Sequence, residues 1–98
     1  MQASLRVRAI EDALVSSLEA VHVEVVDNNA GHANHVGAED GGGHFAVVVV
    51  SEAFRGLSRI AAQKLVYETL AELMTHDIHA LSMRTFTPEQ WTDTRRPR

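Results

Sequence analysis

Histidine side chains gather in a segment that is too long and too rich in glycine for a simple strand connection. His32, His35 and His44 all lie in the segment 28–45, which also contains the triple glycine Gly41–Gly43. Apolar runs typical of strands flank the segment on both sides, whereas most hairpin connections have about two to five residues. Because loops tend to carry function while the scaffold carries stability, the segment 28–45 is the first candidate for a site.

Among side chains that commonly bind transition metals, this chain has several histidines but no cysteine. The sequence contains six histidines and no cysteine. Disulfides, thiolate metal sites and a cysteine nucleophile are therefore excluded for this chain alone. A metal bound here must use imidazole or carboxylate ligands, or thiolates from a partner.

Length and charge limit the remaining classes of function. The 98 residues support one domain with one core, and a composition of 45% apolar and 22% charged residues is ordinary for a globular protein. The net charge is −4 and the basic residues are scattered, which argues against a surface that binds phosphate groups. No apolar run approaches the roughly 18 residues that span a bilayer, and the first residues lack the apolar region of a secretory signal. We expect a cytoplasmic protein with no membrane partner.

Apolar periodicity predicts three helices and three strands. Helical spacing marks the two longer helices, while alternation or a continuous valine run marks the strands. Thr87, Pro88 and Gln90 give the last helix a capping-box start, and Trp91 would pack it against the fold. The expected elements are a helix over 4–20, strands over 21–27 and 44–51, a helix from 59 to 75–77, a strand over 78–86 and a helix from 88.

The order α-β-β-α-β-α predicts an α+β fold with a three-stranded mixed sheet packed by helices. The first two strands share a loop and can pair antiparallel, whereas a long helix joins the second to the third and requires a parallel, right-handed crossover. Helices on one face of the sheet satisfy this arrangement. Residues 1–93 form one domain, and we expect 94–98 to be a flexible basic tail.

An ordered set of motifs resembles the BolA family over about residues 5–91. The set comprises Val25–Asp27, His32, Gly41–Phe45, Val47–Ser58, Leu65–Tyr67 and Ile78–Trp91. The resemblance implies a class II KH-like fold. It also implies a heterodimer with a monothiol glutaredoxin of the Cys-Gly-Phe-Ser type, which shares a 2Fe-2S cluster with the help of glutathione. On its own the chain is expected to carry no cluster and to be a monomer or a weak homodimer.

The resemblance also implies which side chains are the metal ligands. In the family, a histidine of the final strand and a residue of the long loop bind the cluster, and these correspond to His79 and His32. His35 is the alternative to His32, because this loop is longer than the common pattern. We expect a structural or supporting role for His44. The competing interpretations are a hydrogen-bonded strand histidine for His79 and a solvated loop residue for His32.

Two further expectations concern the segment 28–45 and the remaining histidines. We expect the loop to be poorly ordered in the free protein, with His32 near His79, and to close on a metal when a partner arrives. His22 and His76 have no expected role. The glycines Gly41–Gly43 serve mobility and strand entry rather than phosphate binding, because no helix N-terminus follows them.

A DNA-binding transcriptional regulator is the alternative function. It would use the helix-turn-helix-like region Gly56–Lys64, with Arg55, Arg59 and Lys64 as the contacts. Only the first glycine of the Gly-x-x-Gly loop of KH domains is present there. The sequence at 62–64 also departs from the basic Arg-His-Arg that family members often carry, so DNA is the less favoured partner.

Enzymatic activity is not expected. The sequence has no Gly-x-Ser-x-Gly elbow, no paired acid–base carboxylates and no nucleotide-binding loop to accompany its serine, aspartate and histidine residues. The favoured function is therefore that of a non-enzymatic iron–sulfur adaptor.

Overall fold

The computed structural model describes residues 3–28, 43–76 and 78–95. In chain order the elements are α1 (Ala3–Leu18), β1 (His22–Asp27), β2 (Gly43–Val50), the 3-10 helix η3 (Glu52–Phe54), α2 (Arg59–Thr69), α3 (Ala71–His76), β3 (Ile78–Phe86) and α4 (Pro88–Arg95). Within these residues, no helix is both long enough and apolar enough to cross a membrane.

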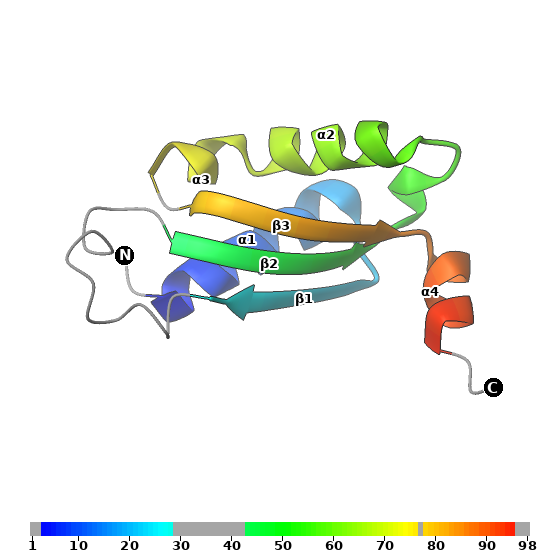
Figure 1. Ribbon diagram of the computed structural model, residues 1–98, viewed down its shortest axis with the longest axis horizontal. Coiled ribbons are helices and arrows are strands. Elements are labelled where there is room, and N and C mark those ends of the chain that lie inside the picture. The colour runs from blue at the N-terminus through cyan, green and yellow to red at the C-terminus, as the bar shows by residue number, and fades with distance from the viewer. Residues whose placement is uncertain (1–2, 29–42, 77, 96–98) are drawn as a thin grey trace.

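The three strands form one mixed sheet in the order β1-β2-β3, as Figure 1 shows. β1 pairs antiparallel with β2, with His22 opposite Val50 and Asp27 opposite Phe45. β2 pairs parallel with β3, through a crossover that contains α2 and α3. The predicted α+β fold with a three-stranded mixed sheet is therefore confirmed.

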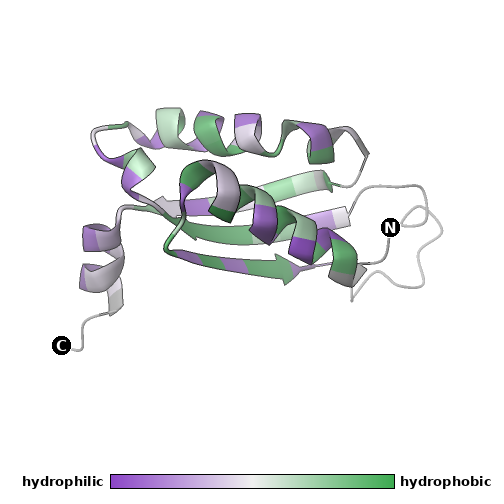
Figure 2. Cartoon of the chain, turned by 180° about the vertical axis from the view of Figure 1, so that it is seen from behind, coloured by the Kyte–Doolittle hydropathy of each residue, from purple (hydrophilic) through white to green (hydrophobic). Residues whose placement is uncertain are grey.

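The hydrophobic core lies between one face of the sheet and the helices α1 and α2. Figure 2 shows α1 in front of the strands and α2 above them. Phe45, Val47 and Val49 of the central strand β2 are at most 2% exposed. They belong to one cluster of buried side chains with Leu14 of α1 and Val66 of α2. Burial of a side chain of this size contributes about 1.5–3 kcal/mol, so the valine-rich sequence of β2 fits its central position.

Ser51 joins the end of α1 to the end of β2. α1 ends at Leu18, because Glu19 adopts a left-handed backbone conformation with φ 51°. The hydroxyl of the fully buried Ser51 donates a 2.6 Å hydrogen bond to the Leu18 carbonyl. The same oxygen accepts a 3.0 Å hydrogen bond from the Ala53 amide, which caps η3. The buried Ser51 side chain thus satisfies a carbonyl at the end of α1 and an amide at the start of η3.

The helix predicted from residue 59 to 75–77 is interrupted, which corrects the expectation of one continuous helix. α2 ends at Thr69, and Leu70 departs from helical geometry with φ −99° and ψ 13° before α3 begins. The Thr69 hydroxyl donates a 2.8 Å hydrogen bond to the carbonyl of Leu65. Such back-bonding competes with the helical ladder and often bends helices. Leu70 itself is buried in the core, so the break leaves its packing intact.

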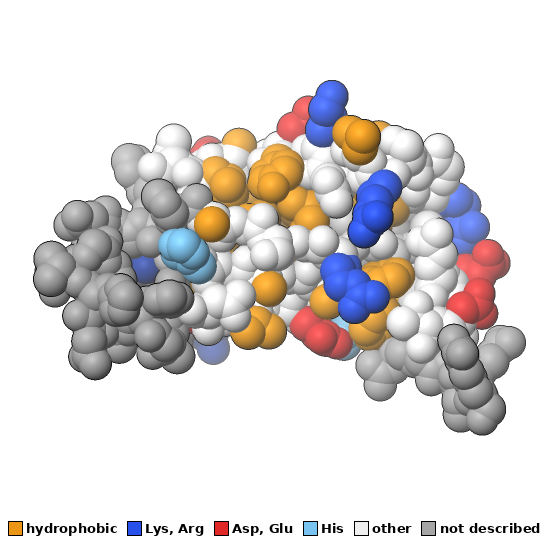
Figure 3. Space-filling view, viewed as in Figure 1, with side chains coloured by type: hydrophobic (Ala, Val, Ile, Leu, Met, Phe, Trp, Pro, Cys, Tyr) orange, Lys and Arg blue, Asp and Glu red, His pale blue; other side chains and the backbone are white. Residues whose placement is uncertain are grey.

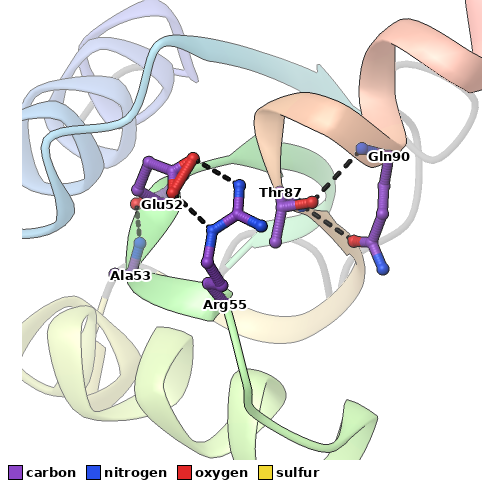
Figure 4. Close-up of polar contacts among 6 residues, drawn as sticks. Glu52, Ala53, Arg55, Thr87 and Gln90 are labelled. Atoms are coloured by element: carbon purple, nitrogen blue, oxygen red, sulfur yellow. Dashed lines mark hydrogen bonds and ion pairs between the residues drawn. The ribbon is translucent and has the colours of Figure 1, made fainter.

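The last helix begins as predicted. The Thr87 amide donates to Oε1 of Gln90 at 2.8 Å, and the Gln90 amide donates to Oγ1 of Thr87 at 3.2 Å (Figure 4). These reciprocal bonds are the capping box. α4 extends to Arg95 and so includes the first two residues of the predicted tail, while 96–98 lie outside the described residues.

Candidate functional site

The predicted ligands are connected to one end of the sheet, where β1 finishes and both β2 and β3 begin. β1 ends at Asp27, and the amide of Asn28 donates a 2.8 Å hydrogen bond to the carbonyl of His44. β2 begins at Gly43, so the last residues of the segment predicted as a loop belong to the sheet. Because β2 and β3 are parallel, the start of β3 lies at this same end (Figure 1).

His79 is the second residue of β3 and lies where the pairing with β2 is irregular. Gly43 pairs with Ile78, but the next residue, His44, pairs with Ala80, so β3 has one residue more than β2 at this step. An extra residue of this kind locally disrupts the hydrogen-bond ladder, and such bulges are frequent beside functional sites. The sheet therefore brings the main chains of His79 and His44 side by side.

The irregularity also changes which residues of β3 meet the core. Ile78 is buried, and Leu81 and Met83 pack against the same core. In an unbroken strand, residues three apart point to opposite faces, so Ile78 and Leu81 could not share one. Simple alternation thus does not extend through the start of β3. No residue of unusual type marks this change in the sequence.

Part of the predicted site lies outside the described residues. His32 and His35 fall within 29–42, and the imidazole of His79 is also outside them. The expected disorder of the loop and the expected meeting of His32 with His79 therefore stay predictions. His44 is exposed on β2. Among the side chains that are described, no three histidine or acidic groups gather in a way that could hold a metal ion.

His22 has a structural role that the sequence analysis did not assign to it. Its Nε2 lies 2.8 Å from Oε2 of Glu24, and its ring stacks on Trp91 with the ring centroids 5.0 Å apart. Trp91 also contacts the ring of Phe86 at 5.3 Å. The prediction that Trp91 packs the last helix against the fold is confirmed, and its partner is a histidine distant in sequence, at the opposite end of the sheet from His79.

The turn before α2 depends on Gly56 and Ser58. Gly56 adopts φ 79°, a conformation that favours glycine. The Ser58 hydroxyl then caps α2 by accepting a 3.0 Å hydrogen bond from the Ala61 amide. This geometry places Arg55 and Arg59 on either side of the turn.

Arg55 is already engaged with a carboxylate. Its guanidinium donates to both oxygens of Glu52, at 2.7 and 2.8 Å (Figure 4). These hydrogen bonds lower the pKa of the Glu52 carboxyl and raise the pKa of Arg55. The pair is exposed, so it remains accessible, but the positive charge of Arg55 is largely offset.

Arg59 and Lys64 are exposed but do not form a continuous basic surface. They are five positions apart along α2, and at about 100° per residue their side chains project roughly 140° apart around the helix. On the face drawn in Figure 3, the blue side chains are separated by white and orange atoms. The three predicted DNA contacts thus lie near one another without forming a single basic stripe.

Comparison with known proteins identifies relatives across most of the chain. Residues 14–90 match the model of the family described as BolA-like protein. The chain is 37% identical over 82 residues to the DNA-binding transcriptional regulator BolA of Escherichia coli, covering 84% of this chain and 75% of that protein. It is 41% identical over 87 residues to BolA-like protein 2 of Mus musculus, covering 89% and 91% of the two chains.

Solved structures agree with the fold. The solution structure of BolA1 from Mus musculus superposes with a TM-score of 0.75 at 34% identity, covering 94% of this chain and 72% of that one. The chain spans a smaller share, 60%, of the BolA-like protein 1 sequences of mouse and human.

Proposed function

The chain belongs to the BolA-like protein family, and on this premise we propose that it is a non-enzymatic iron–sulfur adaptor. Its partner would be a monothiol glutaredoxin of the Cys-Gly-Phe-Ser type. With glutathione, the two proteins would share a 2Fe-2S cluster and hold it or pass it on. The ligands from this chain would be His79 and one loop histidine, with His32 favoured over His35.

One observation carries this proposal: the sheet joins the elements that bear the predicted ligands at a single end. Asp27 and Gly43 anchor the two ends of the segment that contains His32 and His35, and His79 is the second residue of the neighbouring strand β3. The extra residue in β3 supports the proposal further, because it interrupts the regular hydrogen-bonded pairing with β2 at the start of that strand.

The donor set of the chain suits such a cluster only if a partner completes it. A 2Fe-2S cluster needs four ligands, and histidine can replace cysteine on one of its irons, as in Rieske centres. With no cysteine, this chain could offer two imidazoles to one iron, while thiolates for the other iron must come from elsewhere. Imidazole binds metal in its neutral form, so cluster binding should weaken in acid, as histidines become protonated.

Reconstitution of the cluster with the glutaredoxin and glutathione, followed by visible circular dichroism, tests the proposal. His79→Ala should abolish the wild-type spectrum, and His32→Ala should do so unless His35 is the loop ligand. His22→Ala is the matched control, because His22 lies at the opposite end of β1 from the loop. An unchanged spectrum for His79→Ala would show that His79 is not a ligand. Failure of the wild-type proteins to form a shared cluster would refute the adaptor function.

DNA binding remains the second candidate, because three relatives, including that of Escherichia coli, are named DNA-binding transcriptional regulators. It would use Arg55, Arg59 and Lys64 around the turn at Gly56. A regulator of this kind should bind duplex DNA with an affinity that falls steeply as salt rises. The ion pair between Arg55 and Glu52 and the separation of Arg59 from Lys64 favour the adaptor instead. Tight, salt-dependent binding that Arg59→Gln weakens would reverse this preference.

A further inference from the structure

A groove of about 460 Å³ runs between the free edge of β3 and the start of α2. Met83, Arg84, Thr85 and Phe86 of β3 line one side, and residues of the η3–α2 turn and of α2 line the other. Gln90 and Thr94 of α4 also border the groove. Within the described sheet β3 is an outer strand, so no further strand covers this edge. The groove lies at the end of β3 that is opposite to His79 and so is separate from the proposed cluster site (Figure 1).

The lining shows that main-chain groups of β3 are available in the groove. Side chains alternate between the two faces of a strand, so four consecutive residues can line one groove only along the strand edge. The carbonyl of Phe86 accepts a 2.9 Å hydrogen bond from the Ser51 amide, on the β2 side. Since successive residues of a strand direct their main-chain groups to alternate sides, those of Thr85 and Met83 face the groove. An unpaired edge of this kind can accept an added strand.

The charges beside this edge are positive. Arg59 and Arg84 are exposed and line the groove, whereas no aspartate or glutamate among the described residues does. Arg84 lies over the ring of Phe86, 5.3 Å from its centroid, and neither arginine forms an ion pair with a described residue. Met83 and the exposed Leu57 add apolar lining to the groove. The groove thus combines free main-chain donors and acceptors with two available guanidinium groups.

We propose that this groove binds an extended acidic peptide, which adds a strand to the edge of β3. Arg84 belongs to the strand face away from the helices, while Arg59 lies on the helix side, so two adjacent glutamates of the peptide would reach one arginine each. A nucleic acid fits less well, because its phosphates would use the arginines but leave the main-chain amides and carbonyls of Met83 and Thr85 without complementary partners. This inference goes beyond the proposed function and needs no cluster.

Titration of the full-length, ¹⁵N-labelled protein with acetyl-Thr-Val-Glu-Glu-Val-Thr-amide tests the proposal. The amides of Met83 and Thr85 should shift, and their hydrogen exchange should slow by about fivefold or more at saturation, because strand addition protects them. Arg59→Glu or Arg84→Glu should weaken binding by about tenfold, equivalent to about 1.4 kcal/mol. Arg8→Glu, the same charge change at an exposed position on α1, should change the affinity less than about twofold.

Three results would overturn the inference. The first is the absence of binding by the wild-type protein at millimolar peptide. The second is equal binding by a peptide that is N-methylated at alternate residues, which would show charge attraction without strand addition. The third is displacement of the peptide by a single-stranded DNA hexamer at a lower concentration, which would assign the groove to nucleic acid. Both arginines are exposed, so the variants should keep the dispersed spectrum of the folded protein, which the same titration records.

Discussion

The two ends of the sheet are built differently. At the end where β3 finishes, the described residues make specific contacts in close succession, including the Ser51 bridge to α1, the capping box of α4 and the stacking of His22 on Trp91. At the other end, β2 and β3 begin with an irregular pairing at His79, and His44 is exposed beside it. The described contacts thus give the first end a stabilising role, while the second end carries the proposed ligand His79.

His44→Ala should have a large effect on the cluster and a small effect on the fold. Groups that support metal ligands commonly contribute 10–100-fold to metal affinity, so we expect the shared cluster to be lost about that much more readily. Stability should change by less than about 0.5 kcal/mol, because His44 is exposed. Visible circular dichroism of the reconstituted complex and urea denaturation of the isolated chain measure the two effects. A variant that unfolds more easily but holds the cluster normally would contradict the division between the ends.

Ser51→Ala should show the opposite pattern. It leaves the buried Leu18 carbonyl without its partner and removes the cap of η3, which should cost about 1–3 kcal/mol of unfolding free energy in urea denaturation. Ser82→Ala, at an exposed position of β3, is the control and should change stability by less than about 0.5 kcal/mol. Below the unfolding transition, cluster formation by Ser51→Ala should match the wild type.

Thr87→Ala should destabilise the protein by about 1 kcal/mol, the usual value of a lost N-cap. Thr92→Ala makes the same chemical change within α4, but Thr92 only donates a hydrogen bond to the Pro88 carbonyl and is exposed. Thermal unfolding of the two variants should separate them. Equal destabilisation would show that the capping box contributes nothing beyond ordinary helix propensity.

His22→Ala should loosen the contact between α4 and the sheet at a cost of about 0.5–1 kcal/mol, by analogy with aromatic pairs. Trp91 is the single tryptophan of the chain, so its fluorescence reports on this contact directly. A red-shifted emission maximum is expected as Trp91 becomes more accessible to water. An unchanged emission spectrum would show that the other contacts of Trp91, including Phe86, hold the indole in place without His22.

Lowering the pH should have the smallest effect on stability, and at the end where β3 finishes it should act through Glu52. Because Arg55 lowers the pKa of Glu52, the stabilisation from this pair is fully present above the ordinary glutamate pKa and is lost as the pH falls through the lowered value. The pair is exposed and therefore weakened by salt. Carboxyl NMR titration should show the Glu52 midpoint rising in Arg55→Gln. The same charge removal at Arg8 should leave that midpoint in place.

Several features of the fold could be predicted because their signals are local. β3 occupies the predicted 78–86, and the capping box forms at Thr87 and Gln90, as the spacing of Thr, Pro and Gln indicated. The valine run correctly predicted a strand, which is β2, the central strand of the sheet. Its core-facing residues are buried, whereas Ala46 and Val48 on the other face are only partly buried. No glycine or proline in the sequence marks the break at Leu70, so one helix was predicted where α2 and α3 occur.

The candidate site was predictable only as a set of residue types. Absence of cysteine, an abundance of histidine and the order of the motifs belong to the sequence itself, and they determined the family and the chemistry that is proposed. Tertiary structure alone decided that His44 lies beside His79, that β3 carries an extra residue there, and that His22 stacks on Trp91. These are contacts between distant parts of the chain, set by strand register and helix docking rather than by local preference. The preference of a segment for helix or strand depends on neighbouring residues. Strand register depends instead on how all the strands and helices together bury their apolar faces.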